Sequence, residues 1–443
     1  MDNPSLPMPG EAEGRAMHAR LTRLYPLRRA LVGPGAKETL ETIAQELPLA
    51  VSEFPSGTRC WDWTIPKGFS VREAYVEHES GERVLDYADC AYHVPNYSQP
   101  FDGVLSLKDL KARIAVEPAM PSAVPFRFFY YRPDWGLCAS QDQIKRLKPG
   151  RYRVRVDTVL ADDVLRIGEC FLPGESEREI LLTCYVCHPL GANDNLSGTV
   201  LGVELFRLLS RLPRRRYSYR LAVWPEGIGA ITYLHRHEER VKRTLGGYVM
   251  TCCGDPGTFH YKRSLEGGGL ADRAALHALE HCGQAYEVLP FGFHRASDEA
   301  YLSAPGFKLP MGSLMRTPYG AFPQYHTSAD DPSFVTPEAL LGSLRVYWAA
   351  ILAMEENRVY APCYKTLPFL SGHGVYPYHL GAGGGGVMVQ AADAYYQLMG
   401  FADGRADLLS IAGRSGLPMA LFREPVTAFL GAGLLRDVTG EDE

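Results

Sequence analysis

Patterns of buried strands alternate with patterns of helices through the middle of the chain. Arg178 to Cys187 reads REILLTCYVC, a continuous apolar run that is typical of a strand covered on both faces. Asn193 to Asn195 then supply the chemistry of a helix N-cap, and leucines recur at helical spacing from Leu201 to Leu212. The alternation predicts an α/β core with a mixed sheet and helices on both faces. Further strands are expected at 217–224, 247–253 and 308–314, and further helices at 228–239, 270–282 and 337–356.

Two segments depart from this alternation. Between residues 61 and 105 the strand patterns are short, and two of them flank Ser80-Gly81 as in a hairpin. After residue 361, short helical patterns with Gly416 between two of them resemble a winged helix. We therefore predict a core at 16–60 and 106–360, an inserted β domain at 61–105 and a winged-helix-like domain at 361–443.

The composition is that of a globular protein and excludes several classes of partner. The net charge of -5 argues against a surface that binds nucleic acid, so we expect the C-terminal segment to be a packing appendage. We also expect no membrane partner, since no apolar run is long enough to span a bilayer. The N-terminus lacks the pattern of a signal peptide, and the ten cysteines are therefore expected to be reduced thiols in the cytoplasm.

Candidate metal ligands follow the first buried strand. His188 leaves the end of that strand, and Asp194 lies where the next helix begins. Sites in open α/β sheets form at this edge, and imidazole and carboxylate are suitable ligands for zinc. The alternative is that Asp194 only caps the helix.

Two later junctions add a base and a further ligand. Glu226 stands between a strand and a helix, where a carboxylate is a suitable general base beside a metal-bound water. The alternative is that it only complements the helix dipole. His326 lies just before the last long helix and can supply the remaining nitrogen ligand, although a lone histidine is more often structural.

The order of these motifs resembles a known family. The chain reads HP then NDN-SG, PE-IG, SDE followed by GF-LP, and YHTS-DD, which resembles the aminopeptidase-like proteins related to the aminopeptidase Y type of zinc exopeptidase. It is similar in particular to a bacterial group with an inserted β domain and a C-terminal winged helix, from about Thr22 to Asp437. The resemblance implies that His188, Asp194 and His326 hold zinc and that Glu226 is the general base.

Two positions depart from the di-zinc members of that family. They carry a second glutamate directly after the base, where this chain has Gly227, and an aspartate after the next strand, where Thr251 and then Asp255 stand. We therefore expect one zinc ion per chain, with a water in the fourth position. A second metal ion stays open.

Several other side chains are candidates for the substrate site. Asp298 and Glu299 are expected to bind a substrate amino group or to orient His326, and Arg316 and Tyr325 to bind a carboxylate or stabilise an oxyanion. Ordinary packing is the alternative for the last two. Trp61, Trp63 and Tyr92 are predicted to form the core of the inserted β domain, with an aromatic wall as the alternative.

These observations predict a zinc-dependent hydrolase of amide or peptide bonds. The expected substrate is a small peptide or an aminoacylated metabolite, and the protein is expected to be able to form a homo-oligomer. Two alternatives remain from other classes. One is a non-catalytic protein that binds a metal or a partner, and the other is a zinc-dependent cyclase or acyl transferase.

Overall fold

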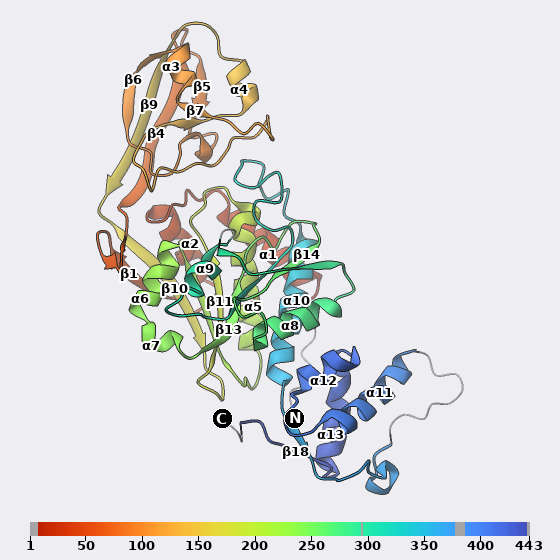
Figure 1. The fold of residues 1–443 in the computed structure, drawn as a ribbon. Helices are drawn as coiled ribbons and strands as arrows, with labels where there is room; N and C mark the ends of the chain where they lie inside the picture. Colours follow the sequence, from red (N-terminus) through yellow and green to blue (C-terminus); the bar gives the residue numbers. More distant parts are fainter. Residues whose placement is uncertain (1–7, 294–295, 377–385, 441–443) are drawn as a thin grey trace. The chain divides into compact units, whose positions relative to one another are not determined.

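A computed structural model describes residues 8–293, 296–376 and 386–440, and the chain folds into two compact units. The larger unit comprises Pro7–Gly269 and Ala285–Arg345, and it contains two substantial sheets. The smaller unit comprises Leu270–Gln284 and the described residues from Val346 onward. Figure 1 shows the elements of both.

The larger unit is built on an eight-stranded mixed sheet in the order β1-β10-β12-β11-β13-β16-β14-β15. Strand β11 pairs in parallel with both β12 and β13, whereas β10 runs antiparallel to β12 and to β1. Every residue of β11 and β12 is buried, as the apolar runs predict. The strands are β1 (Ala50–Pro55), β10 (Val164–Leu172), β11 (Glu179–Tyr185), β12 (Ser218–Trp224), β13 (Thr244–Val249), β14 (Phe259–Lys262), β15 (Tyr286–Leu289) and β16 (Met311–Met315).

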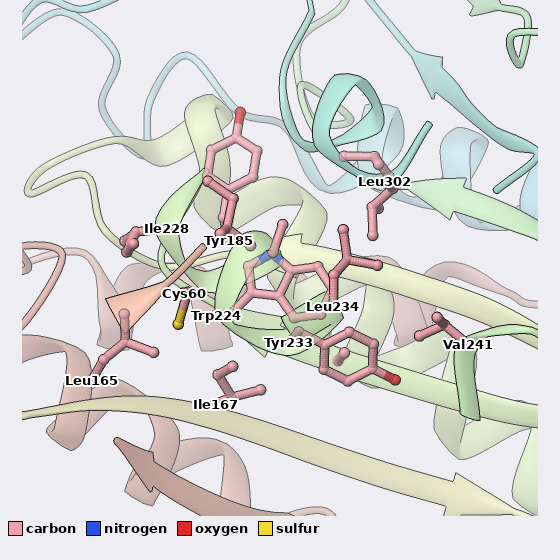
Figure 2. Close-up of a cluster of buried hydrophobic side chains, with 14 of the residues drawn as sticks. Cys60, Leu165, Ile167, Tyr185, Trp224, Ile228, Tyr233, Leu234, Val241 and Leu302 are labelled. Carbon is pink, nitrogen blue, oxygen red and sulfur yellow. The ribbon is translucent and has the colours of Figure 1, made fainter. Parts of the chain in front are cut away.

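Helices flank this sheet (Figure 1). Helix α6 contributes Ile231 and Leu234 to a cluster around the buried ring of Trp224, which Figure 2 shows in close-up. This packing fixes the end of β12, where Glu226 follows. The helices of this unit around the sheet are α1 (Glu11–Leu24), α2 (Pro34–Ala44), α5 (Gly198–Ser210), α6 (Ile228–Arg236), α7 (Glu238–Val241) and α9 (Asp298–Leu302).

The second sheet is antiparallel, in the order β5-β4-β9-β6, and has its own apolar core. The predicted hairpin is confirmed, since β4 pairs with β5. Strand β9 lies outside the predicted range of 61–105 because it is contributed from far downstream, but its alternating burial matches a half-exposed strand. The elements are β4 (Gly68–His78), β5 (Arg83–Asp86), β6 (Phe101–Ser106), β9 (Arg151–Ala161), α3 (Leu107–Lys111) and α4 (Gln141–Lys145), with short ladders β2 (Arg59–Cys60), β3 (Trp63–Thr64), β7 (Ile114–Ala115) and β8 (Leu137–Cys138).

The smaller unit is mainly helical. Arg273 of α8 forms an ion pair with Asp407, which also caps α12, so α8 belongs to this unit although it precedes residue 361. Helix α10 (Pro337–Glu356) contributes residues to both units. The winged-helix resemblance stays a prediction. The elements are α8 (Leu270–Glu280), α11 (Gly386–Phe401), α12 (Leu408–Ser415), α13 (Arg423–Gly431), β17 (Tyr360–Pro362) and β18 (Leu435–Asp437).

The predicted α/β class with a mixed sheet is confirmed. Among the described residues, no helix combines the length and the apolar character needed to cross a bilayer.

Candidate metal centre

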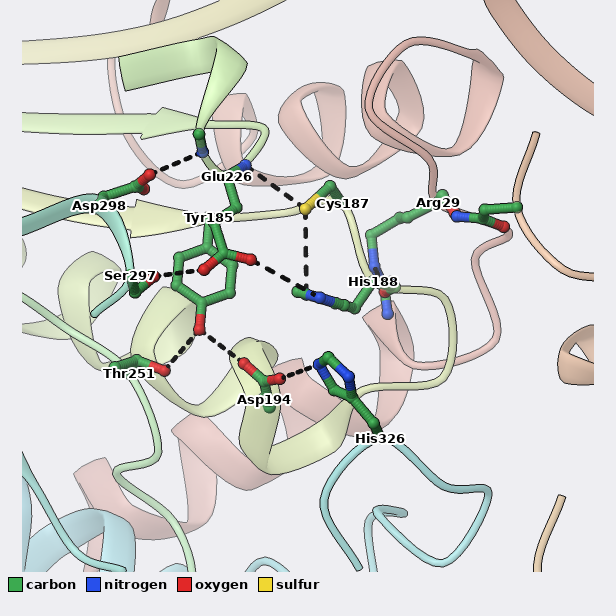
Figure 3. Close-up of polar contacts among 12 residues, drawn as sticks. Arg29, Tyr185, Cys187, His188, Asp194, Glu226, Thr251, Ser297, Asp298 and His326 are labelled. Carbon is green, nitrogen blue, oxygen red and sulfur yellow. Dashed lines mark hydrogen bonds and ion pairs between the residues drawn. The ribbon is translucent and has the colours of Figure 1, made fainter. Parts of the chain in front are cut away.

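Three of the predicted side chains meet beyond the carboxyl end of β11. His188 follows that strand, Asp194 lies in the turn Ala192–Ser197 before α5, and His326 comes from the loop between β16 and α10. Their ligand atoms all lie within 4.8 Å of one another. Figure 3 shows the three side chains pointing toward one another. The topology therefore brings together residues that are far apart in the sequence.

The imidazole of His326 has a nitrogen that the protein does not satisfy. Nε2 lies 3.1 Å from Oδ2 of Asp194, but it is buried without a hydrogen-bond partner among the described residues. The backbone holds this ring in place: His326 has a φ of 54°, which is uncommon outside glycine, and its carbonyl accepts the N–H of Phe126 at 2.7 Å. Tyr325 stacks on the ring with centroids 3.9 Å apart.

Asp194 is held from two sides. The hydroxyl of Tyr185 donates to Oδ1 at 2.6 Å, and it also contacts the hydroxyl of Thr251 at 2.9 Å. The turn itself is fixed by Asp330, whose carboxylate accepts the N–H groups of Asn193 and Asp194 at 2.6 and 2.9 Å. Burial acts to raise the pKa of Asp194, but its interactions with His188, His326 and Tyr185 outweigh burial and lower the pKa to about 2. The carboxylate is therefore ionised.

His188 is suited to bind a cation as a neutral imidazole. Burial lowers its pKa to about 4, against the opposing influence of Asp194. Its backbone carbonyl accepts a hydrogen bond from Nε of Arg29 at 2.8 Å, which anchors the residue. A neutral ring leaves one nitrogen lone pair for a metal ion.

Glu226 lies beside the three ligands. Its Oε2 is 3.7 Å from Nε2 of His188, and its other oxygen accepts a short hydrogen bond from the hydroxyl of Ser297. Its backbone N–H is directed at Sγ of Cys187, 3.4 Å away. Burial, together with the nearby charges of Asp298 and Asp194, raises the pKa of Glu226 well above its usual value. A carboxylate with a raised pKa is a stronger base, which suits proton transfer near neutral pH.

Three of the predicted substrate contacts, Asp298, Glu299 and Arg316, interact with protein groups in the structure. Asp298 and Glu299 are both 0% exposed, and protein donors occupy their carboxylates. Asp298 accepts from Nε1 of Trp224 and from the N–H of Gly227, both at 2.7 Å. Glu299 accepts from Lys262 and Tyr319, also at 2.7 Å each. The sequence pattern placed these acids correctly near the site but not their orientation, which tertiary contacts determine.

The side chain of Arg316 also contacts other protein groups. Its guanidinium lies 3.8 Å from the ring centroid of Phe259 and donates to the carbonyls of Gly257 and Ala339. It supports the loops around β14 and does not contact the cluster. Tyr325 differs, because its ring lies directly against His326, and burial raises the pKa of its hydroxyl so that the group stays protonated.

Asp255 and Thr251 make contacts with protein groups. Asp255 accepts from Asn193, Gly257 and Thr317, which satisfies both of its oxygens. Thr251 contacts Tyr185. Neither residue belongs to a group of clustered metal-ligating side chains among the described residues. A second metal ion therefore stays a prediction without added support.

A cavity of about 240 Å³ opens beside Glu226 and His188. Most of the aromatic rings that line this cavity come from the segment 63–131, which includes strands of the second sheet. Tyr301 of α9 supplies another ring. Trp63 is one of these rings, so it forms part of a wall, whereas Tyr92 packs in a buried cluster and Trp61 is largely exposed. The rings that the segment contributes are Trp63, Tyr97, Phe126, Phe128, Tyr130 and Tyr131.

Several residues of the site were missed by sequence reasoning. Tyr185 and Ser297 each hold a predicted functional carboxylate, and Asp330 holds the turn. Nothing in the sequence indicates a polar role for Tyr185, because this residue lies in a strand pattern that is otherwise apolar. Ser297 and Asp330 stood inside quoted motifs, SDE and YHTS-DD, and proximity to a predicted ligand was the only signal available.

The donor set fits zinc. Two imidazole nitrogens and one carboxylate are typical of catalytic zinc sites, in which three protein ligands leave the fourth position to a water. The unpartnered nitrogen of His326 supports this interpretation, because a buried polar atom without a partner is costly unless a ligand satisfies it. A separate group comprises His277, Glu280 and His281; Nε2 of His277 accepts the N–H of Met419, and its Nδ1 is buried without a hydrogen-bond partner among the described residues.

Comparisons with known proteins agree with this fold. Residues 18–357 match the family model described as a domain of unknown function, DUF4910. A Clostridium acetobutylicum protein, whose assigned name refers to polysaccharide biosynthesis and an aminopeptidase-like domain, is 37% identical over 424 residues, which is 96% of each chain.

Solved structures give the same result. A structure from Clostridium acetobutylicum, named as a peptidase, has a TM-score of 0.88 at 35% identity and covers 97% of both chains. A zinc aminopeptidase from Bacillus subtilis has a TM-score of 0.56 at 15% identity, covering 76% of this chain and 94% of its own. The second likeness is one of fold alone. The chain therefore belongs to the DUF4910 family and has the fold of the zinc aminopeptidases.

Proposed function

We propose that this protein is a zinc-dependent hydrolase of amide or peptide bonds. The observation that carries the proposal is the convergence of His188, Asp194 and His326, with a buried nitrogen of His326 that has no hydrogen-bond partner among the described residues. Glu226 lies next to these ligands and opens onto a cavity. The proposal is thus supported by candidate ligands, a candidate base and a cavity that lie close together at one edge of the sheet.

The residues divide the chemistry among them. His188, Asp194 and His326 would hold the zinc ion, which would supply Lewis acidity to a scissile carbonyl and to a water molecule. Glu226 accepts the proton of that water and delivers it to the leaving amine. The side chain is 29% exposed, so it can reach the water. Ser297 holds it in orientation.

Other side chains position these groups. Tyr185 orients Asp194, and Asp298 fixes the turn that carries Glu226 through its hydrogen bond to Gly227. Such supporting hydrogen bonds tune metal sites as much as the ligands do. Tyr325 is the candidate donor to the oxyanion, because its protonated hydroxyl belongs to the ring that stacks on His326.

The test is hydrolysis by the zinc-loaded full chain against a panel of small amides, with products identified by mass spectrometry. The panel contains dipeptides, aminoacyl anilides and an N-acetylated amino sugar, the last because one relative's name refers to polysaccharide biosynthesis. We expect release of a free amine and a carboxylic acid, lost on chelation and restored by zinc. A cyclised product would contradict hydrolysis, and absence of turnover across the panel would favour a non-catalytic protein.

A further inference from the structure

An aromatic wall lines the cavity beside Glu226 and His188. Phe126 lies edge-on to both His188 and His326, with centroids 5.2 Å apart in each case. Contacts then continue from Phe126 to Phe128 at 6.0 Å and from Phe128 to Tyr131 at 6.0 Å. The wall therefore begins at the metal ligands themselves.

The wall closes near the general base. Tyr131 lies 6.4 Å from Trp63, which in turn lies 6.1 Å from Tyr301 in an edge-to-face arrangement. Tyr301 packs beside Gly227, the residue after Glu226, since a Cβ there would lie 3.4 Å from the Tyr301 hydroxyl. Gly227 has a φ of 71°, which disfavours any other residue. No carboxylate can therefore stand directly after the base without backbone strain.

The cavity offers almost no charge to a ligand. Among the described residues that line it, none is lysine or arginine, and Glu226 is the one carboxylate. The nearby acids Asp298 and Glu299 are fully buried and bound to protein donors. Because Glu226 has to reach a water, it is not free to pair with an ammonium group of the substrate.

We infer that this cavity binds an uncharged, ring-bearing acyl group, so that the enzyme cleaves amides whose amino group is blocked rather than those with a free ammonium. The inference rests on the proposed function and narrows its substrate class. A neutral ring gains apolar contact and edge-to-face packing with the wall. A primary ammonium would lose its hydration there without gaining an ion pair, which is costly.

Aromatic walls can also attract cations. A ring face attracts a nearby cation, most strongly when the cation is weakly hydrated. A primary ammonium is strongly hydrated, so this attraction does not replace the hydrogen bonds that it gives up. Discrimination against it should therefore be at least about tenfold, the size expected when one buried polar group is left unpaired.

Two measurements on the zinc-loaded full chain test the inference. The first is the ratio of kcat/KM for N-acetyl-L-phenylalanine p-nitroanilide to that for L-phenylalanine p-nitroanilide. The second is binding of benzyl alcohol and of benzylammonium at pH 7 by ligand-observed NMR, which needs no turnover. Tyr131 is 68% exposed, so Tyr131→Ala should fold, and Tyr131→Phe is its matched control.

We expect kcat/KM to be at least about tenfold higher for the acetylated anilide than for the free amine, and benzyl alcohol to bind at least about tenfold more tightly than benzylammonium. Tyr131→Ala should weaken benzyl alcohol severalfold, while Tyr131→Phe should not. The inference would be overturned if the compound with the free amine were preferred in either assay, or if Tyr131→Ala did not weaken the binding of benzyl alcohol. Neither result would contradict the proposed hydrolase function. Neutral binding that depends on Tyr131, with no amide cleaved, would instead support the cavity assignment and contradict the proposed function.

Discussion

Nε2 of His326 lies 3.1 Å from Oδ2 of Asp194, yet the two atoms share no hydrogen bond, and that nitrogen has no other partner among the described residues. Two polar atoms at this separation that do not bond to each other can both point at a third species. His188 completes the group on the opposite side. The arrangement is what a metal site requires: ligand atoms that converge on a shared centre.

The hydroxyl of Tyr185 should tune metal affinity. Tyr185→Phe keeps the packing of the ring but removes the hydrogen bond to Asp194, and loss of such a partner typically weakens metal binding by about 10- to 100-fold. Competition with a chromophoric chelator measures the zinc Kd. Tyr233→Phe, which removes another buried tyrosine hydroxyl in the same apolar cluster, should leave the Kd unchanged. An unchanged zinc Kd in Tyr185→Phe would show that the Tyr185 hydroxyl does not tune metal affinity.

Glu226 should affect catalysis without affecting metal content. Glu226→Gln preserves the size of the side chain and its contact with Ser297, but an amide cannot accept the proton. We expect kcat to fall by about 10²- to 10⁴-fold, with zinc stoichiometry unchanged. Steady-state kinetics beside elemental analysis separates the two. Loss of zinc in this variant would make Glu226 a ligand instead of a base.

The pH dependence of activity should respond to Ser297. Its hydrogen bond favours the ionised form of Glu226 and so lowers a pKa that burial raises. Removing the donor in Ser297→Ala should raise the pKa further, and because the base acts when ionised, the acid limb of the kcat profile should move to higher pH. Ser297→Thr keeps a hydroxyl and serves as the control. A shift to lower pH, or none, would contradict this assignment.

Tyr325 should contribute through its hydroxyl. Tyr325→Phe retains the stack on His326, so zinc content should hold, while loss of one oxyanion donor lowers kcat by about 10²- to 10³-fold. KM should change little, because the interaction belongs to the transition state. A matched change in KM with kcat intact would indicate ground-state binding instead.

The sequence was sufficient for the core of the fold and for the residues that end its strands. Continuous apolar runs identify β11 and β12, and polar residues immediately after them must lie at one sheet edge, which is how His188 and Glu226 were found. His326 was a weaker candidate from its place before the last long helix, since a histidine in a loop carries no periodic signal, and the family resemblance added to it.

The orientation of side chains was not accessible in the same way. Asp298 and Glu299 stand in the SDE motif, but donors from distant segments, Trp224 and Lys262, turn their carboxylates inward. The aromatic wall is hidden for a similar reason. Its rings lie in irregular segments or in elements too short to show a strand or helix period. Only the folded arrangement shows that Trp63 contacts both Tyr131 and Tyr301.

The most direct test is zinc content, measured by inductively coupled plasma mass spectrometry on wild type, His188→Ala, His326→Ala and His281→Ala, with circular dichroism to check folding. His281 belongs to the separate histidine group and is the matched control. We predict about one zinc per chain in wild type and in His281→Ala, and almost none in the other two, because a site with three protein ligands is badly weakened by losing one. Zinc retained in folded His188→Ala and His326→Ala, or absent from zinc-supplemented wild type, would contradict the account.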